Sequence, residues 1–206
     1  MPRDTYVLRS TLTSPFGRKV RMAIDVLGLS DLIKIIPADT LDETDTLRLQ
    51  NPLGKLPCLL LADGTALYDS VVIVEFLQEI AGTDALLPRN GLERYKTLTA
   101  TTLADGITDA ALLLVYEGRF RDEGTYSERW LKHQRGKITR ALATLEAAPP
   151  DPKQTDIASI ALGCAFGYLD WRKPFEWRAA HPRLVQWLEA FTAHEPAYAR
   201  TAIPSA

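Results

Sequence analysis

The sequence predicts two domains of different class, an α/β domain followed by an all-α domain. Strand and helix signals alternate from the N-terminus to about residue 82, whereas no convincing strand pattern occurs from Glu93 onward. The segment between them contains proline, asparagine and glycine, a composition typical of a linker. We therefore expect an α/β domain over residues 1–82, a linker over 83–92 and an all-helical domain over 93–206.

The first strand and helix are predicted from a change in hydrophobic period. Residues 6–9 form a short β-prone run, and apolar residues then recur at helical spacing and stop at Gly28. Pro15 suits the first helical position, where its missing N–H costs no hydrogen bond, and Gly28 suits a left-handed helix end. A helix that begins at Pro15 makes Ser14 the expected N-cap.

The rest of the first domain is expected to contain three more strands and two more helices. The pair Asp63-Gly64 lies between two β-prone runs and is a hairpin signal. The last helix of the domain ends at Gly82. In chain order we expect a strand at 32–36, a short irregular helix within 39–50, strands at 58–61 and 66–68, and a helix at 70–81.

The second domain is predicted from apolar residues at helical spacing. The segment after Asp156 is apolar on every side, so we expect it to be the central helix, capped by that aspartate. Prolines at 149, 150 and 152 end the helix before it. The other expected helices are one long helix from Glu93 to about Arg121, one with the apolar stripe Ile138, Leu142 and Leu145, and one that opens at His181-Pro182.

Composition excludes several functional classes. The chain has 206 residues, of which 46% are hydrophobic and 24% charged, and its formal net charge is −2. It has no signature of disorder and no basic excess for binding nucleic acid. No apolar run approaches the roughly 18 residues that cross a bilayer, and residues 1–4 do not open a secretion signal. We therefore expect a cytoplasmic protein without a membrane or nucleic-acid partner.

Cysteines and histidines show no metal-binding or redox pattern. Cys58 and Cys164 lie in apolar surroundings and form no C-x-x-C pair, so we expect buried, reduced thiols. The histidines are His133, His181 and His194, and none has a partner at metal-ligand spacing. We interpret them as surface or helix-end residues and expect no metal.

Polar residues at helix starts and in one turn are candidates for ligand binding. Ser14 either only caps its helix or donates its proton to an anion beside the positive end of the helix dipole. Lys55 is a candidate for binding a carboxylate, or is a solvated lysine. Asp69 and Ser70 begin the next predicted helix, where capping alone would explain them.

The turn before the strand at 58–61 contains Leu56-Pro57. A proline at a strand start cannot donate to the ladder, and a cis bond turns the preceding peptide group outward. Leu56 would then offer its N–H and C=O to a ligand. Because cis bonds are a minority even before proline, the segment taken alone is interpreted as an ordinary turn.

Together and in this order, the segments resemble the cytosolic glutathione transferases across essentially the whole chain. The shared motifs are S-P-F…R-K-V at 14–20, N-P-x-G-K-x-P at 51–57 and D-S at 69–70. Small bacterial members are also similar through T-S-P-F-x-R-K and A-L-A-D-G-I-x-D-A, the latter at 102–110, where Thr102 stands at the first position in this chain. The resemblance implies a thioredoxin-like N-terminal domain, a helical C-terminal domain, a homodimer, and glutathione as co-substrate without a metal.

The resemblance also assigns roles to residues. Ser14 would contact the glutathione thiol, as in the classes that use serine, and the backbone of Leu56 would pair with the cysteinyl part, with the following proline cis. Lys55 would face the glycyl carboxylate. Asp69 would face the γ-glutamyl ammonium, where many relatives have glutamate, and Ser70 would bind the γ-glutamyl carboxylate. The implied glutathione-binding set is completed by Phe16 and Pro57.

A serine donor is sufficient for thiol activation. Lowering a thiol pKa by about two units needs roughly 2.7 kcal/mol. One hydrogen bond to a charged acceptor supplies about 1.5–3 kcal/mol and the helix terminus about 0.3–1 kcal/mol. Ser10, Thr11 and Thr13 compete with Ser14 for this role. Because Ser14 stands where C-P-F relatives carry cysteine, thiol–disulfide exchange is not expected.

The position of the electrophile is the least determined part of the site. Tyr116, Arg119, Phe166 and Trp171 are candidates to line a pocket between the domains, or else the aromatic residues pack in a core and Arg119 is solvated. Addition to activated double bonds, halide displacement, isomerisation and peroxide reduction all stay open. The alternative function is a non-catalytic module that binds glutathione or a protein partner.

Overall fold

The computed structural model describes residues 6–203 and divides into two compact units. The first unit comprises the chain up to Arg89 together with the segment from Ala197 onward, and the second is Asn90–Pro196. The first unit contains β1 (Tyr6–Arg9), α1 (Pro15–Val26), the 3-10 turn η1 (Ser30–Leu32), β2 (Ile33–Ile36), α2 (Leu47–Gln50), β3 (Cys58–Leu60), β4 (Ala66–Leu67), α3 (Ser70–Ala81) and α8 (Ala197–Arg200).

A four-stranded mixed sheet in the order β2-β1-β3-β4 forms the centre of the first unit. β1 pairs with β2 in parallel and with β3 antiparallel, and β3 and β4 form an antiparallel hairpin. A parallel pair needs a crossover connection, which α1 supplies between β1 and β2. The hairpin turns at the predicted Asp63-Gly64, where Gly64 has a φ of 88° and the Asp63 carboxylate accepts a hydrogen bond from the Thr65 N–H at 2.8 Å.

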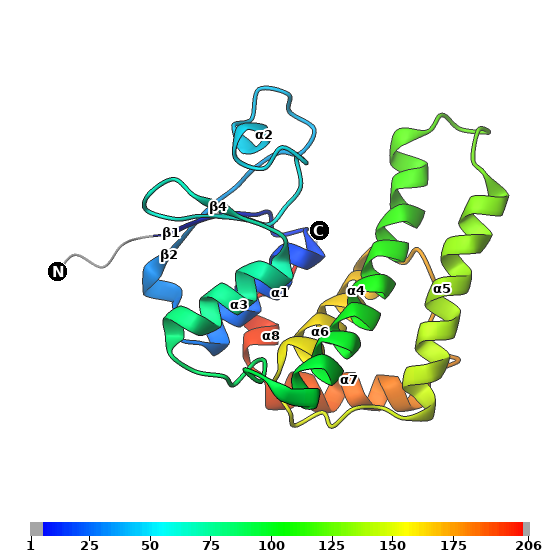
Figure 1. Cartoon of the computed structure of the whole chain (residues 1–206). Helices are drawn as coiled ribbons and strands as arrows, with labels where there is room; N and C mark the ends of the chain where they lie inside the picture. The colour runs from blue at the N-terminus through cyan, green and yellow to red at the C-terminus, as the bar shows by residue number, and fades with distance from the viewer. Residues whose placement is uncertain (1–5, 204–206) are drawn as a thin grey trace. The chain divides into compact units, whose positions relative to one another are not determined.

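Helices cover both faces of this sheet. α1 and α3 lie side by side on one face, and α2 lies on the other (Figure 1). Successive residues of a strand point to opposite faces. Cys58 accordingly packs with Leu47 of α2 and with Ala38, while its neighbour Leu59 is fully buried on the opposite face. This is the thioredoxin-like arrangement that the sequence analysis predicted for the N-terminal domain.

The boundary between the units lies between Arg89 and Asn90, within the predicted linker at 83–92, but part of that segment is packed in the first unit. Leu86 and Leu87 are buried in the first unit. The buried side chain of Gln78 binds them, because its Oε1 accepts from the Leu86 N–H at 2.9 Å and the Leu87 N–H at 2.7 Å. Its Nε2 donates to the Leu87 carbonyl at 2.7 Å. The turn-forming residues of this segment predicted a linker. Composition gives no sign of the hydrogen bonds from Gln78.

The C-terminal tail also differs from the predicted division, in which residues 93–206 form one domain. α8 belongs to the first unit. Arg18 of α1 donates to the Tyr198 carbonyl at 2.8 Å, and its guanidinium lies 4.1 Å from the Tyr198 ring centre. Arg200 pairs with Asp25 of α1 at 2.6 Å. These contacts join α8 to α1.

The second unit is helical, as predicted. Its helices are α4 (Gly91–Phe120), α5 (Glu128–Ala147), α6 (Ile157–Arg172) and α7 (Pro182–His194). α6 is the central helix and is buried from Ser159 to Leu169. Asp156 caps it, with its side chain accepting from the Ser159 N–H at 2.8 Å and the Ser159 hydroxyl bonded to the Asp156 N–H at 2.9 Å. α4 packs on both α5 and α6.

α4 is long and apolar enough, by length and composition, to cross a membrane. A single such helix is weak evidence, because the core helix of a soluble protein passes the same test. The residues that α4 buries include Ala104, Thr108 and Ala111, which recur at helical spacing. We therefore interpret α4 as a core helix of the second unit.

Both cysteines are buried, as predicted, and neither forms a disulfide within the described residues. Burial raises the pKa of the Cys58 thiol above its ordinary value. His181 lies at the start of α7 as expected, but it is buried rather than at the surface, and its Nδ1 lies 2.7 Å from the Trp177 carbonyl.

The loop before α2 is organised by the carboxylate of Asp45. Its oxygens accept from the Leu47 N–H at 2.7 Å and the Asp39 N–H at 2.8 Å, and it pairs with the nearly buried Arg9 at 2.7 Å. These contacts, above all those with the two N–H groups, hold the pKa of Asp45 below its ordinary value of 3.8. A carboxylate with a depressed pKa stabilises the folded state above its unfolded pKa.

Replacing Asp45 with asparagine should lower the melting temperature at neutral pH, since an amide keeps fewer of these bonds. The difference from the wild type should shrink as the pH falls through the depressed pKa of Asp45, because wild-type Asp45 then also loses its charge. Thermal melts followed by circular dichroism, repeated at several pH values in the acid range, measure this difference in melting temperature. Glu79→Gln, at an exposed position of α3, is the control. A difference that stays constant into strong acid contradicts this account.

Candidate functional site

Three segments of the first unit meet at one end of the sheet, where β1 ends and β3 begins. β1 ends where β3 begins, since Arg9 pairs with Cys58. β4 runs antiparallel to β3 with Leu67 opposite Leu59, so the residues after β4 approach the start of β3. α1 follows β1 and α3 follows β4, and Figure 1 shows both helices beginning at this end of the sheet. The register therefore brings together the turn before α1, the turn before β3 and the turn before α3.

Ser14 is the N-cap of α1, as the sequence predicts. Its Oγ accepts a hydrogen bond from the Gly17 N–H at 3.0 Å, and Pro15 is the first helical residue. The cap uses an oxygen lone pair and leaves the hydroxyl proton free to donate. Gly17 permits this close packing, because a side-chain carbon there would overlap the Ser10 hydroxyl and lie 3.2 Å from the Ser14 Oγ. Capping and donation to an anion are thus compatible roles for one hydroxyl.

The neighbouring hydroxyls are engaged elsewhere. Ser10 is 1% exposed, and its hydroxyl donates to the Thr11 carbonyl at 3.3 Å. The hydroxyls of Thr11 and Thr13 lie 3.2 Å apart and bond to each other. These contacts favour Ser14 over its neighbours as the donor at the start of α1.

The turn before β3 presents the backbone of Leu56. The Leu56–Pro57 bond is cis, as the family resemblance implies. The Leu56 side chain packs on the cluster formed by Ala38, Leu47 and Cys58, whereas its N–H and C=O make no hydrogen bond within residues 6–203. An unpaired backbone donor and acceptor side by side can bind an extended peptide as a strand would. Lys55, just before it, is exposed.

Asn51 holds this turn, and the sequence analysis assigned it no role. It is 1% exposed, its Nδ2 donates to the Lys55 carbonyl at 2.9 Å, and its Oδ1 accepts from the Leu53 N–H at 3.1 Å. A buried asparagine that satisfies two backbone groups fixes the path of the chain before β3. The sequence feature that could have identified this role is the place of Asn51 as the first residue of the N-P-x-G-K-x-P motif.

The start of α3 contributes Asp69 and Ser70. Asp69 is exposed and caps the helix, with Oδ1 accepting from the Val71 N–H at 3.0 Å. Its other carboxylate oxygen accepts no hydrogen bond from the described residues. Ser70 is 2% exposed, yet its hydroxyl has no hydrogen-bond partner within residues 6–203. Because buried polar groups are normally paired, this hydroxyl is available to a ligand. The Tyr68–Asp69 bond is also cis.

Phe166 does not line a pocket, which corrects the sequence-based expectation. It is fully buried in the second unit, stacked on Trp177 at 4.4 Å between ring centres and edge-on to Trp187 at 5.9 Å. Because α6 is apolar on every side, its sequence does not distinguish a core face from a ligand face. The packing interpretation is correct for this residue.

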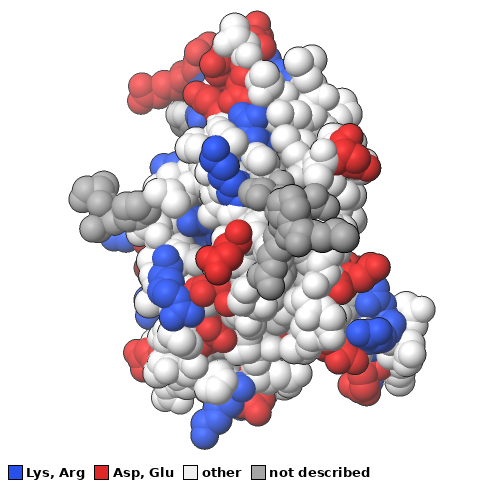
Figure 2. Space-filling model, turned by 90° about the vertical axis from the view of Figure 1, so that its left-hand side faces the viewer, with Lys and Arg blue, Asp and Glu red and all other residues white. Residues whose placement is uncertain are grey.

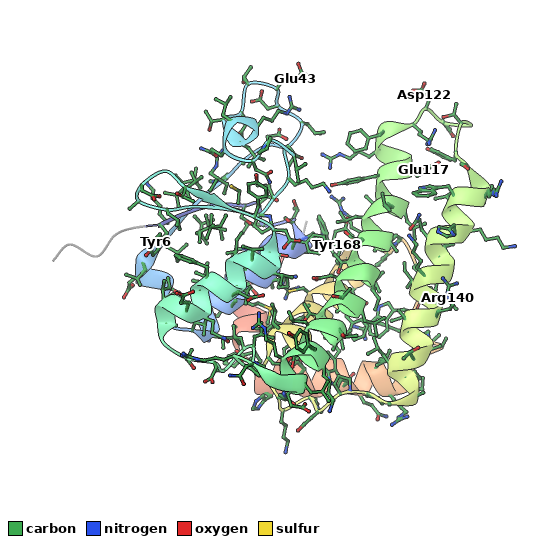
Figure 3. The ribbon with its side chains drawn as sticks, viewed as in Figure 1. Tyr6, Glu43, Glu117, Asp122, Arg140 and Tyr168 are labelled. Atoms are coloured by element: carbon green, nitrogen blue, oxygen red, sulfur yellow. The ribbon has the colours of Figure 1, made fainter. Side chains whose placement is uncertain are left out.

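The other three candidate electrophile residues lie on α4 and α6 around a residue that the sequence analysis missed, Tyr168, which Figure 3 labels. The Arg119 guanidinium lies 5.9 Å from the Tyr116 ring centre. Trp171 is edge-on to Tyr168 at 6.1 Å. Burial raises the pKa of Tyr168 to about 12, and the nearby Arg172 partly offsets this effect.

Figure 2 shows basic and acidic side chains interspersed over one face of the molecule, without a continuous basic surface on that face. Among residues 6–203, no group of three or more histidine, cysteine, aspartate or glutamate side chains is arranged to hold a metal ion.

Comparisons with known proteins identify one family. The family model described as glutathione S-transferase, N-terminal domain, matches residues 13–80. The model described as glutathione S-transferase, C-terminal domain, matches residues 128–190. The uncharacterized GST-like protein YibF of Escherichia coli K12 is 36% identical over 205 residues, which cover 97% of this chain and 99% of YibF.

Solved structures agree with the family models. A glutathione transferase family member from Pseudomonas fluorescens Pf-5 with bound glutathione is 38% identical, covers 98% of this chain and 100% of its own, and superimposes with a TM-score of 0.90. A structure from the same organism with bound S-(propanoic acid)-glutathione is 38% identical over 97% and 100% of the two chains, with a TM-score of 0.86. The chain belongs to the glutathione S-transferase family.

Proposed function

We propose that this protein is a glutathione transferase in which Ser14 stabilises the thiolate of bound glutathione for attack on a small electrophile. The observation that carries the proposal is the geometry of Ser14, whose oxygen accepts from the Gly17 N–H at 3.0 Å while its proton stays free. A thiolate at this position receives that proton as a hydrogen bond and lies beside the positive end of α1.

The energies are sufficient for this role. A hydrogen bond to a charged acceptor contributes about 1.5–3 kcal/mol and a helix terminus about 0.3–1 kcal/mol. Lowering the thiol pKa by about two units needs roughly 2.7 kcal/mol. The thiol proton leaves to solvent, and Ser14 keeps its own proton throughout. The sulfur then attacks the electrophile as an anion.

The turns before β3 and α3 supply groups that match the remainder of glutathione. The unpaired N–H and C=O of Leu56 pair with the cysteinyl residue, and the cationic Lys55 faces the glycyl carboxylate. The free carboxylate oxygen of Asp69 faces the γ-glutamyl ammonium, and the unpartnered hydroxyl of Ser70 binds the γ-glutamyl carboxylate. Phe16 and Pro57 complete the binding residues.

The ligands of homologous structures support a glutathione-conjugating function. The Pseudomonas fluorescens family members were crystallised with glutathione and with S-(propanoic acid)-glutathione, whose sulfur carries a three-carbon acid. A homologous site that holds both the free thiol and an S-substituted form can accommodate the substrate and the product of a conjugation. By this analogy we propose that the present chain also binds both glutathione and an S-substituted glutathione.

The non-catalytic module remains the second candidate, and one observation favours it. The cap at 3.0 Å explains Ser14 completely without a thiol. Such a module binds glutathione through the turns before β3 and α3 but leaves the pKa of the glutathione thiol unchanged. Thiolate formation at neutral pH therefore distinguishes the two functions.

Replacing Ser14 with alanine should abolish the ultraviolet absorbance of bound thiolate at neutral pH and lower turnover at least tenfold, because the thiolate loses a hydrogen bond of about 1.5–3 kcal/mol. Glutathione binding, measured by calorimetry, should change less. Difference spectra of wild type and variant with glutathione make the test.

The matched control is Thr13→Ala, which removes an exposed neighbouring hydroxyl and should keep the thiolate band. Unchanged turnover in Ser14→Ala overturns the role of this residue. A wild-type protein that binds glutathione with measurable heat but shows no thiolate band establishes the module instead.

We also infer that the protein is a cytoplasmic homodimer. The cytosol is the compartment that glutathione keeps reduced, which agrees with two buried cysteines that form no disulfide within the described residues. The second unit carries an apolar groove between α4 and α5 whose lining includes Leu92, Tyr95 and Ala141. Leu92 is 68% exposed and Tyr95 is 65% exposed. We assign a second copy of the chain to this surface.

Replacing Leu92 with glutamate should shift the protein from twice the chain mass to the chain mass, because a charge would be buried against the second copy. Light scattering coupled to size-exclusion chromatography measures the mass. Leu49→Glu, at an 87% exposed leucine of α2, is the control and should leave the dimer intact. A wild-type monomer, or a dimer in Leu92→Glu, contradicts the assigned surface.

A further inference from the structure

We propose that Asn90 is a site of spontaneous covalent modification, at which the Gly91 nitrogen closes a succinimide ring and water opens that ring to aspartate or isoaspartate. The inference concerns the chain itself, so it does not depend on the proposed function. It is carried by two neighbouring groups at the start of α4, a side-chain amide and a backbone nitrogen, which the fold leaves free.

The carboxamide of Asn90 has no partner. Asn90 is exposed and occupies the N-cap position of α4. An asparagine at this position normally accepts a hydrogen bond from a first-turn N–H. The side chain of Asn90 makes no such bond, and it has no other hydrogen-bond partner within residues 6–203. The carboxamide carbon is therefore open to attack by the next nitrogen of the chain.

The backbone nitrogen of Gly91 is the attacking atom. Gly91 is exposed and is the first residue of α4, and first-turn N–H groups have no acceptor within their own helix. No other acceptor in the part of the chain that the structure describes binds this N–H. The nitrogen can therefore lose its proton without breaking a hydrogen bond of the fold.

Gly91 also leaves room for the ring to close. No heavy atom outside the adjoining chain lies within 4 Å of the position that a side-chain carbon would occupy there. Its φ of 79° lies in the left-handed region, which glycine adopts without strain. Ring closure requires rotation about the extended backbone of Asn90, and the glycine beside it does not hinder that rotation.

The reaction consumes only water. The Gly91 nitrogen loses its proton and forms a bond to the side-chain carbon Cγ of Asn90, and the bond from Cγ to the amide nitrogen breaks as ammonia leaves. Water then opens the succinimide ring. Breakage of the new bond to Cγ gives aspartate with the ordinary backbone, whereas breakage of the original peptide bond gives isoaspartate, in which Cγ continues the chain.

The fold protects the other asparagine of the chain, Asn51. It is 1% exposed, and its amide is bonded to the Lys55 carbonyl at 2.9 Å and to the Leu53 N–H at 3.1 Å. The residue after it is Pro52, whose nitrogen carries no proton to lose. Asn51 is therefore an internal control for the reaction at Asn90.

The two aspartate-glycine pairs, Asp63-Gly64 and Asp105-Gly106, are restrained as well. In the first pair, the glycine N–H donates to the Leu61 carbonyl at 3.0 Å. In the second, the glycine lies inside α4, where its N–H belongs to the hydrogen-bond ladder of the helix. An ionised carboxylate is also a poorer electrophile than a carboxamide. These differences single out Asn90 as the reactive position.

Both products change the first turn of α4. Aspartate adds a negative charge at the positive end of the helix dipole, and isoaspartate also adds a carbon to the main chain. The residue after Gly91 is Leu92, which lines the apolar groove between α4 and α5. The modification thus gives the chain a change of charge, accumulating with time, beside this groove.

The test incubates the full chain in a mildly alkaline buffer made with oxygen-18 water and then cleaves it after glutamate in mild acid. Mass spectrometry of the fragment 80–93 should show labelled aspartate and isoaspartate at residue 90, which separate on chromatography. The fragment 44–75 should lose the Asn51 amide at least about tenfold more slowly, because reaction there must first break two hydrogen bonds.

Asn90→Gln is the matched variant, since it keeps an exposed carboxamide but lengthens the side chain by one methylene, which disfavours the ring. It should lose both products. Aspartate without isoaspartate in the wild type shows direct hydrolysis and overturns the ring mechanism. An unchanged residue 90 in the full chain, in a buffer where a synthetic peptide of residues 80–93 reacts, shows that the fold protects Asn90 and overturns the proposal.

Discussion

The antiparallel register of β3 with β1 and β4 is the constraint on which the proposed glutathione-binding end of the sheet depends. It sets Arg9 against Cys58 and Leu59 against Leu67. Three turns that are separate in sequence meet because of these pairings. A slip of one residue would turn Cys58 away from α2 and expose the face it now buries. The hydrophobic pattern of a three-residue strand therefore fixes where the polar turns are placed.

At this end of the sheet, the same residues stabilise the fold and keep groups for the proposed ligand. Ser14 and Asp69 each satisfy a first-turn N–H of a helix, and each retains one hydrogen-bonding group for another partner. Leu56 places its side chain in the core and leaves its peptide groups unpaired. Ser70 is buried without a partner in the described chain. Folding leaves these groups incompletely paired, and such groups are suited to recognising a peptide.

In the second unit, the arginines near the ends of α4 and α6 differ in the groups that they contact. Arg178 pairs with the Asp170 carboxylate, whereas the guanidinium groups of Arg119 and Arg172 lie against aromatic rings. Helical position made Arg119 a candidate from the sequence, and its role stays a prediction. The same criterion misassigned Phe166 and overlooked Tyr168 for one reason, which is that α6 is apolar on all sides and its pattern does not indicate which face meets the core.

The sequence by itself determined the element order, the caps at Ser14 and Asp156 and the motif residues of the first unit. These signals act within about one helical turn or one strand pair, so they are legible locally. Only the tertiary structure decided that Gln78 holds the chain at residues 86–87 and that Arg18 binds Tyr198. A hydrogen bond between residues 180 positions apart leaves no local pattern in the chain, because its partners become neighbours only when the fold is complete.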